Sequence, residues 1–214
     1  MAQNFLKKWE APRKDETLGS KLKEAIQPSP PLKARIEYVS RMIEIQKSKL
    51  DQLFNRLMER DRRLFEYLVN YYSKHDINRA KVYANEIAGI RKFAKVVLQS
   101  KLALESIILR LETIKDYGDV TSTLIPVANI IKAIKNKIGS VLPATETGLT
   151  EISNEINSLL SESGNISTPN ITFEAMNEEV EKILSDARII AEKKLKETFT
   201  EIPTYIEKEK ESKL

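Results

Sequence analysis

The sequence predicts an all-α protein, in which a long antiparallel helical hairpin is followed by shorter C-terminal helices. Charged residues make up 31% of the 214 residues, and there are only 6 glycines and 8 prolines. This composition favours long helices, because Leu, Ala, Glu, Lys and Arg keep most of their rotamer freedom in a helix. Apolar residues also recur at every seventh position through two long stretches, which are separated by one short polar break.

Residues 1–30 are expected to be a flexible N-terminal segment with one short amphipathic piece. In NFLKKWE (4–10), Phe5, Leu6 and Trp9 project from one side of a helix and two lysines from the other. This pattern is typical of an anchor that lies in a membrane interface. A tail without structure, or a tryptophan that docks on the hairpin, is an equal alternative. QPSPP (27–31) then breaks the chain before the first long helix.

The hairpin is predicted from two helices, the first over residues 32–72 and the second ending near DYG (116–118). The apolar stripe of the first helix is Ile36, Ile43, Leu50, Leu57, Leu64 and Tyr71, and that of the second is Tyr83, Ile90, Val97, Leu104 and Leu111. SKHDINR (73–79) interrupts the pattern, and Asp76 or Asn78 can cap the second helix. Pairing the two stripes removes them from water and gives a hairpin of about 60 Å.

Three shorter helical segments are expected after the hairpin. The first, over residues 119–139, has apolar residues at helical spacing. LPATETG (142–148) is expected to be a linker, and residues 149–160 a short amphipathic helix. The last helix, about 173–199, begins with glutamates and ends with lysines, a polarity that complements the helix dipole.

The charges of the chain are unevenly distributed. Residues 1–110 hold 23 Lys and Arg against 13 Asp and Glu, a net charge of +10, whereas residues 111–214 hold 12 against 18, a net charge of −6. The split suggests that the front half meets an anionic partner and that the back half competes for the same surface. The alternative is two unrelated solvated faces.

Six cations of the first helix form a basic strip within roughly 80° of one another, at 100° per residue. They are Arg35, Lys49, Arg56, Arg60, Arg63 and Lys74. Such a strip suits binding to a membrane with anionic lipids, where each cation adds about 1 kcal/mol. Alternatively, some of these arginines pair with the neighbouring helix or with Asp61. Nucleic acid ranks lower as a partner and is not expected, because the aromatic residues lie mostly at or near the apolar stripe.

The residues give no support to an enzyme, a cofactor or a metal site. The chain has no cysteine, which excludes disulfides and thiol catalysis, and no nucleotide-phosphate motif. His75 is the only histidine and falls in the predicted turn, where a solvated role is far more common than catalysis. No apolar run approaches the ~20 residues that span a bilayer.

YANEIAGIRK (83–92) places small residues and a glycine inside a predicted helix. Ala84, Ala88 and Gly89 would allow another helix to approach closely. Because glycine costs about 1 kcal/mol relative to alanine in a helix, we expect Gly89 to serve a contact between subunits or a hinge. A tight crossing by the third helix of the same chain is the alternative.

AKVYANEIAGIRKFAKVVLQSKLALESIILRLETIKDYGDV (80–120) resembles the second helix of ESCRT-III proteins, and more closely the archaeal CdvB family of cell division proteins. The chain resembles a shorter paralogue without the winged helix. The resemblance implies an ESCRT-III core over 31–140 that polymerises with copies of itself and related subunits. It also implies a cytoplasmic protein that is peripheral on the inner face of the membrane at midcell, where it constricts the membrane.

The same resemblance implies that residues 141–214 are an acidic regulatory region. In this family an AAA-type ATPase with a MIT domain binds the C-terminal tail and removes subunits, and acidic C-terminal helices restrain assembly. The matching positions are Ile183, Leu184, Ala187, Arg188, Ile190 and Lys194. Their register departs from the family motif, since Arg188 follows Leu184 by four residues, so a stretch around Pro203 is a second candidate. A cytosolic helical scaffold or adaptor is the runner-up function, and a nucleic-acid-binding helical protein the third.

Overall fold

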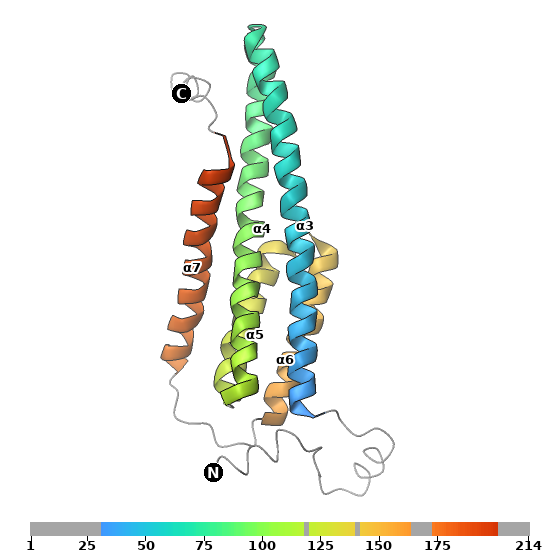
Figure 1. The fold of residues 1–214 in the computed structure, drawn as a ribbon, viewed down its shortest axis with the longest axis vertical. Helices are drawn as coiled ribbons and strands as arrows, with labels where there is room; N and C mark the ends of the chain where they lie inside the picture. The colour runs from blue at the N-terminus through green and yellow to red at the C-terminus, as the bar shows by residue number, and fades with distance from the viewer. Residues whose placement is uncertain (1–30, 118–119, 140–141, 164–172, 201–214) are drawn as a thin grey trace, which may run out of the picture. The chain divides into compact units, whose positions relative to one another are not determined.

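A computed structural model describes residues 31–117, 120–139, 142–163 and 173–200 of the chain (Figure 1). These residues form five helices and no strand: α3 (Leu32–Ser73), α4 (Ile77–Tyr117), α5 (Val120–Ile138), α6 (Pro143–Ser163) and α7 (Phe173–Thr198). The all-α prediction and both long helices are therefore confirmed.

The chain divides into two compact units. Unit 1 comprises Met1–Gln46 and Leu104–Glu181, and unit 2 comprises Lys47–Ala103 and Lys182–Leu214. Helices α3, α4 and α7 contribute residues to both units, whereas α5 and α6 belong to unit 1 alone. Neither unit therefore corresponds to one continuous stretch of sequence.

In unit 2, α3 and α4 form the antiparallel hairpin that the sequence predicts. Asp61 pairs with Arg91 and Asp51 pairs with Lys101, so the two helices run in opposite directions past each other. The turn between them uses His75 in a left-handed conformation, with φ of 58°. The Asp76 carboxylate accepts a hydrogen bond from the backbone N–H of Arg79 at 3.2 Å, which confirms one of the two predicted caps of α4.

The core of unit 2 is formed by one stripe of each helix. Leu50 and Leu68 of α3 are buried, as are Ile87, Ile90 and Val97 of α4. Leu57, Leu64, Tyr71 and Tyr83, which continue the predicted stripes, are only partly buried. The heptad pattern thus locates the contact between the two helices, although parts of both stripes stay open to water.

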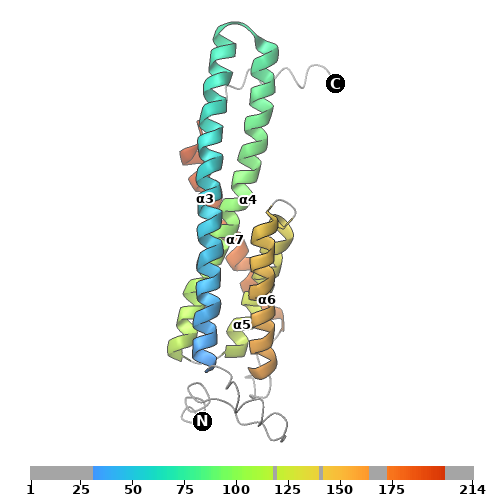
Figure 2. The ribbon, with the colours of Figure 1, turned by 90° about the vertical axis from the view of Figure 1, so that its right-hand side faces the viewer.

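The core of unit 1 is larger because α5 and α6 add two more apolar faces. These helices pack side by side (Figure 2). Fully buried side chains come from α3, α4, α5 and α6. They include Ile36, Ile43, Leu104, Leu111, Leu124, Ile131, Ile134, Ile152 and Ile156. Pro126 lies inside α5 and is itself buried.

The linker predicted over residues 142–148 is wrong, because α6 already begins at Pro143 and continues to Ser163. Proline is well suited to the first position of a helix, since its fixed φ is helical and its missing N–H would have no partner there. Gly148 lies within this helix, where the Gln46 side chain of α3 occupies the space that a Cβ would need. Glycine here allows close packing instead of ending the helix.

Candidate interaction surfaces

The exposed part of the basic strip lies in unit 2, on α3. Lys49, Arg56, Arg63 and Lys74 are exposed, and within the described residues none of them forms an ion pair. Arg60 also lies on this face and pairs with Glu86 of α4 at 2.6 Å. The structure therefore places four unpaired cations on one solvent-facing side of the helix.

Tyr67 belongs to the same face, because it follows Arg60 by seven residues and precedes Lys74 by seven. Its side chain is 52% exposed. The ring stacks on Tyr83 of α4 with the centroids 5.5 Å apart, and Tyr83 in turn stacks on Tyr71 at 5.4 Å. Burial raises the pKa of the Tyr83 hydroxyl, and Tyr71 raises it further. Sequence reasoning assigned the aromatic residues to the apolar stripe and missed this one, although the helical spacing of Tyr67 signals it.

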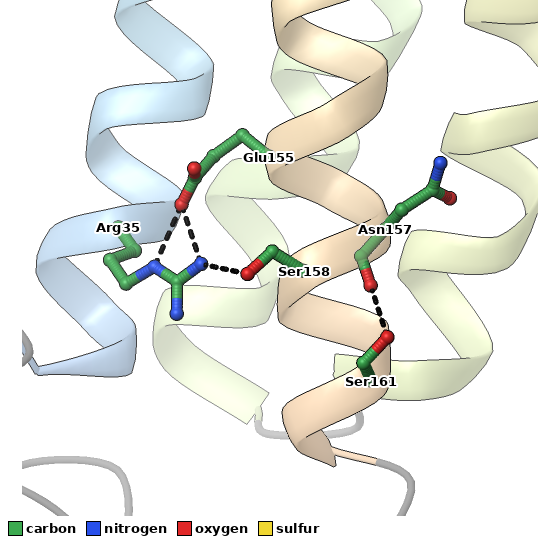
Figure 3. Close-up of polar contacts among 5 residues, drawn as sticks. All are labelled: Arg35, Glu155, Asn157, Ser158 and Ser161. Carbon is green, nitrogen blue, oxygen red and sulfur yellow. Dashed lines mark hydrogen bonds and ion pairs between the residues drawn. The ribbon is translucent and has the colours of Figure 1, made fainter.

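Arg35, the first residue of the predicted basic strip, is in a different environment. It lies in unit 1, where only 11% of its side chain is exposed. Its guanidinium donates to Glu155 at 2.7 Å and to Ser158 at 2.9 Å, and both partners come from α6 (Figure 3). Nearby on α6, the Ser161 hydroxyl donates to the Asn157 carbonyl at 2.9 Å. Arg35 thus joins α3 to α6, in line with the alternative that some arginines of the strip pair with a neighbouring helix.

Asp61 is the one acidic residue that is buried among the described residues of unit 2, with 5% exposure. Its partner is Arg91 of α4, whose guanidinium donates to both carboxylate oxygens at 2.7 and 3.1 Å. The same guanidinium lies over the Phe199 ring, 4.7 Å from its centroid. Arg91 therefore links the hairpin to the residue that follows α7, and no cation of the basic strip is paired with Asp61.

The part of α7 that belongs to unit 2 is held by a buried apolar stripe and an ion pair. Ala187, Ala191 and Leu195 are buried, and Glu192 pairs with Lys95 of α4 at 2.8 Å. The hydrogen bond from Lys95, followed by that from Arg188, holds the pKa of Glu192 below its usual value. Its carboxylate therefore stays ionised at neutral pH, and the ion pair persists.

The segment of α7 that belongs to unit 1 is held by a separate pair. Glu179 pairs with Arg110 of α4. Burial lowers the pKa of Arg110, although an arginine remains charged over the physiological range. A carboxylate partner offsets the cost of burying this charge.

The residues expected to bind the ATPase fall on two sides of α7. Ala187 is buried, and Ile183 and Leu184 are partly buried. Arg188, Ile190 and Lys194 are exposed, as is Ile189, which sequence reasoning did not select and which is 62% exposed. A partner can therefore reach one side of the docked helix but not the side that carries Ala187. Pro203 lies outside the described residues.

The small-residue turn of α4 is also divided between two environments. Ala84 packs against the Leu68 and Ile87 cluster inside the hairpin, whereas Ala88 and Gly89 are exposed. A Cβ built on Gly89 would meet no atom within 4 Å. Among the described residues no helix crosses closely there, so the alternative of a tight crossing within the chain receives no support.

The remaining expectations concern the N-terminal anchor, membrane spans and metal sites. Phe5, Leu6 and Trp9 lie outside the described residues. Among the helices that are described, none is long and apolar enough to cross a membrane. The same residues contain no group of three or more side chains suited to hold a metal ion.

Taken together, these features define an all-α protein built on a helical hairpin with an exposed basic face. Comparison with known proteins supplies the family. The chain is 34% identical over 203 residues to Cell division protein B1 of Sulfolobus acidocaldarius. The aligned residues cover 95% of this chain and 91% of that protein. The chain therefore belongs to the CdvB family of archaeal cell division proteins, and the family resemblance of the second helix is confirmed.

Two further proteins of the same organism are similar to the chain. Cell division protein B is 32% identical over 172 residues, which cover 80% of this chain and 66% of that protein. Cell division protein B3 is 25% identical over 158 residues, which cover 73% and 90% respectively. No protein-family model matches the chain. No solved structure matches it significantly.

Proposed function

We propose that this chain is a non-catalytic, filament-forming subunit of archaeal cell division that binds and constricts the inner face of the cell membrane. The names of its relatives support a role in division. The exposed basic face of α3 carries the membrane part of the proposal. Anionic lipid headgroups are the binding partner, and midcell is the place of action.

The basic face suits a lipid surface for two reasons. Lys49, Arg56, Arg63 and Lys74 are exposed without a partner among the described residues, and each cation near an anionic leaflet contributes about 1 kcal/mol. Tyr67 adds an amphipathic ring, a side chain that favours the headgroup region. A single chain would therefore bind modestly, and a filament would bind much more tightly because its subunits bind together.

Assembly with copies of the chain and with related subunits is the second part of the proposal. Three paralogous division proteins in one organism support pairing between family members. Ala88 and Gly89 are exposed, and an exposed helical glycine costs about 1 kcal/mol that no contact within the described residues recovers. A contact between subunits would account for that cost.

Disassembly and restraint involve α7. The docked helix covers part of α4 through Ala187, Ala191 and Leu195 and is held by the Glu192 pair with Lys95. An AAA-type ATPase with a MIT domain would first meet Arg188, Ile190 and Lys194, which are exposed. Full recognition of the face that includes Ala187 requires α7 to leave the hairpin. Binding by the ATPase would thus be coupled to release of this helix.

Co-sedimentation of the full chain with vesicles that contain anionic lipid tests the membrane proposal. The variant Arg56→Glu with Arg63→Glu reverses two cations of the basic face and leaves the Arg60 pair intact. The control, Lys132→Glu with Lys137→Glu, reverses two exposed cations of α5. Both variants lower the formal net charge from +4 to 0, so they are matched in net charge and differ in where the charge is changed.

We expect the α3 variant to lose binding by at least about tenfold, because two contributions of about 1 kcal/mol are replaced by repulsion. The α5 variant should retain most of the binding. Added salt should weaken binding of the unaltered chain, because it screens exposed charges. Equal binding by the α3 variant and the unaltered chain would contradict the proposal, as would an equal loss in the α5 control.

A further inference from the structure

Helix α4 carries an exposed patch in unit 1 that no described residue covers. Leu109 is 61% exposed. Glu105 and Glu112 precede and follow it by four and three residues, so all three side chains share one face of the helix. Both glutamates are exposed, and neither pairs with a described residue. This Leu109 patch thus presents one apolar side chain between two carboxylates that no described residue pairs.

A second exposed face of α4 lies in unit 2 and has the opposite character. It comprises Val82, which is 66% exposed, with Ala88, Gly89 and Lys92. The space above Gly89 is open, because a Cβ there would meet nothing within 4 Å. Lys92 is exposed and forms no ion pair with the rest of the described chain. This Gly89 face thus presents a gap beside an apolar side chain and a free cation.

The Leu109 patch and the Gly89 face complement each other in shape and charge. An exposed leucine matches a glycine gap, which is how a side chain on one helix fits between those of another. One carboxylate of the Leu109 patch, either Glu105 or Glu112, matches the Lys92 ammonium, and such a pair guides partners into register. The two surfaces lie twenty residues apart on one continuous helix, so they cannot meet within one molecule.

We propose that the Leu109 patch of one copy docks on the Gly89 face of a second copy. This inference rests on the proposed assembly into filaments and names the surfaces that form it. Each copy carries one of each surface, and the two surfaces differ, so the contact is heterologous. A heterologous contact that does not close into a ring continues as an open chain.

Engineered cysteines test this contact, because the natural chain contains no cysteine that could react instead. Two double variants keep Gly89 and Leu109 and place cysteines beside them: Ala88→Cys with Ser106→Cys, and Ala88→Cys with Thr113→Cys. Each, in the full chain, is oxidised with and without vesicles that contain anionic lipid, and at least one of them should be linked. We expect a ladder of disulfide-linked dimers, trimers and longer species on denaturing gels. A disulfide requires Cα atoms within roughly 7 Å, so only apposed surfaces are linked.

Two kinds of control make the ladder specific. Each single variant should give no disulfide-linked dimer, because the contact joins unlike surfaces. The double variant Ser48→Cys with Thr113→Cys pairs the same patch with an exposed serine of α3 and should remain monomeric on the gel. Absence of a ladder from both Ala88 pairs in both conditions would overturn the inference, and so would an equal ladder from the Ser48 pair.

Charge reversal in the linked two-cysteine background supplies an independent check. Lys92→Glu should raise the protein concentration needed for cross-linking by at least about tenfold, because like charges would face each other. Glu105→Lys with Glu112→Lys should do the same, and the two sets combined should restore cross-linking. Failure of the combined variant to recover would contradict the assigned pairing. All three residues are exposed, so the helical circular dichroism signal should be unchanged.

Vesicle binding by the same proteins separates this inference from the proposed function. Variants that bind anionic vesicles but form no ladder would refute the contact and leave the membrane proposal standing. Variants that form the ladder but do not bind vesicles would refute membrane binding and leave the contact standing.

Discussion

Unit 1 and unit 2 use the same helices α3, α4 and α7 for different physical purposes. Among the described residues, 19 buried Ile, Val, Leu or Ala side chains lie in unit 1, and none of them is an alanine. Unit 2 has 13, of which five are alanines: Ala80, Ala94, Ala103, Ala187 and Ala191. Since stabilisation by burial grows with apolar area, unit 1 holds most of the hydrophobic stabilisation.

The charges of the two units differ in the opposite sense. Among the described residues, unit 2 has 18 Lys and Arg against 9 Asp and Glu, a net charge of +9, whereas unit 1 has 8 against 13, a net charge of −5. The part of α3 and α4 in unit 1 therefore contributes mainly to a hydrophobic core, and the part in unit 2 presents positive charge to an anionic partner. The charge asymmetry that the sequence shows between its halves is therefore also present between the two units.

The largest effect should come from the core of unit 1. Ile131→Ala removes a fully buried side chain of α5 and should lower the free energy of unfolding by about 2–5 kcal/mol. Ile189→Ala, at an exposed position of α7 in unit 2, should change it by no more than about 0.5 kcal/mol. Urea unfolding followed by circular dichroism measures both. Similar losses at the two sites would remove the energetic contrast between the units.

A smaller effect, of opposite sign, is expected from glycine replacements. Gly89→Ala should raise the free energy of unfolding by about 1 kcal/mol, because the exposed helix gains propensity and the new Cβ meets nothing. Gly148→Ala in unit 1 should bring no such gain, because its Cβ would overlap the buried Gln46 side chain and overpacking costs about 1–3 kcal/mol. Thermal unfolding compares the two variants. Equal stabilisation would show that Gly148 is not held by close packing.

The smallest effect concerns the docking of α7 in unit 2. The pKa of Glu192 is held below its usual value by the hydrogen bond from Lys95, so its contribution is present above the unfolded pKa of about 4.3. It is lost as the pH falls through the lower, folded pKa. Glu192→Gln should therefore destabilise the chain at pH 7, and its difference from the unaltered chain should shrink below about pH 4. A difference independent of pH, in urea unfolding across this range, would contradict this assignment.

The sequence was sufficient for the elements whose signals are local and periodic. The heptad stripes through Ile43 and Val97 predicted α3, α4 and their pairing, because a buried face repeats along a helix. The beginning of α6 was missed, because PATETG has the composition of a linker. The glycine at 148 serves close packing against Gln46, which is far away in the sequence. Composition alone cannot reveal such a packing partner.

The candidate surfaces were predictable to the same extent. The exposed cations at Lys49, Arg56 and Arg63 follow from helical spacing alone. Helical spacing does not predict that Arg35 is withdrawn from the basic face, because its partner Glu155 lies 120 residues away in the sequence. The burial of Ala187 likewise depends on where α7 docks. Local spacing identifies a face of a helix, but only the tertiary structure decides whether that face is covered.

The central claim is that unit 2, and not unit 1, meets the membrane. An environment-sensitive fluorophore attached to one engineered cysteine tests it directly, because the chain has no other cysteine. Asn70→Cys places the dye on the basic face one heptad after Arg63, and Asn154→Cys places it on α6; both positions are exposed. We predict that anionic vesicles shift the emission to the blue for Asn70→Cys and leave Asn154→Cys unchanged. A shift at Asn154→Cys alone, or no shift at either position, would contradict the account.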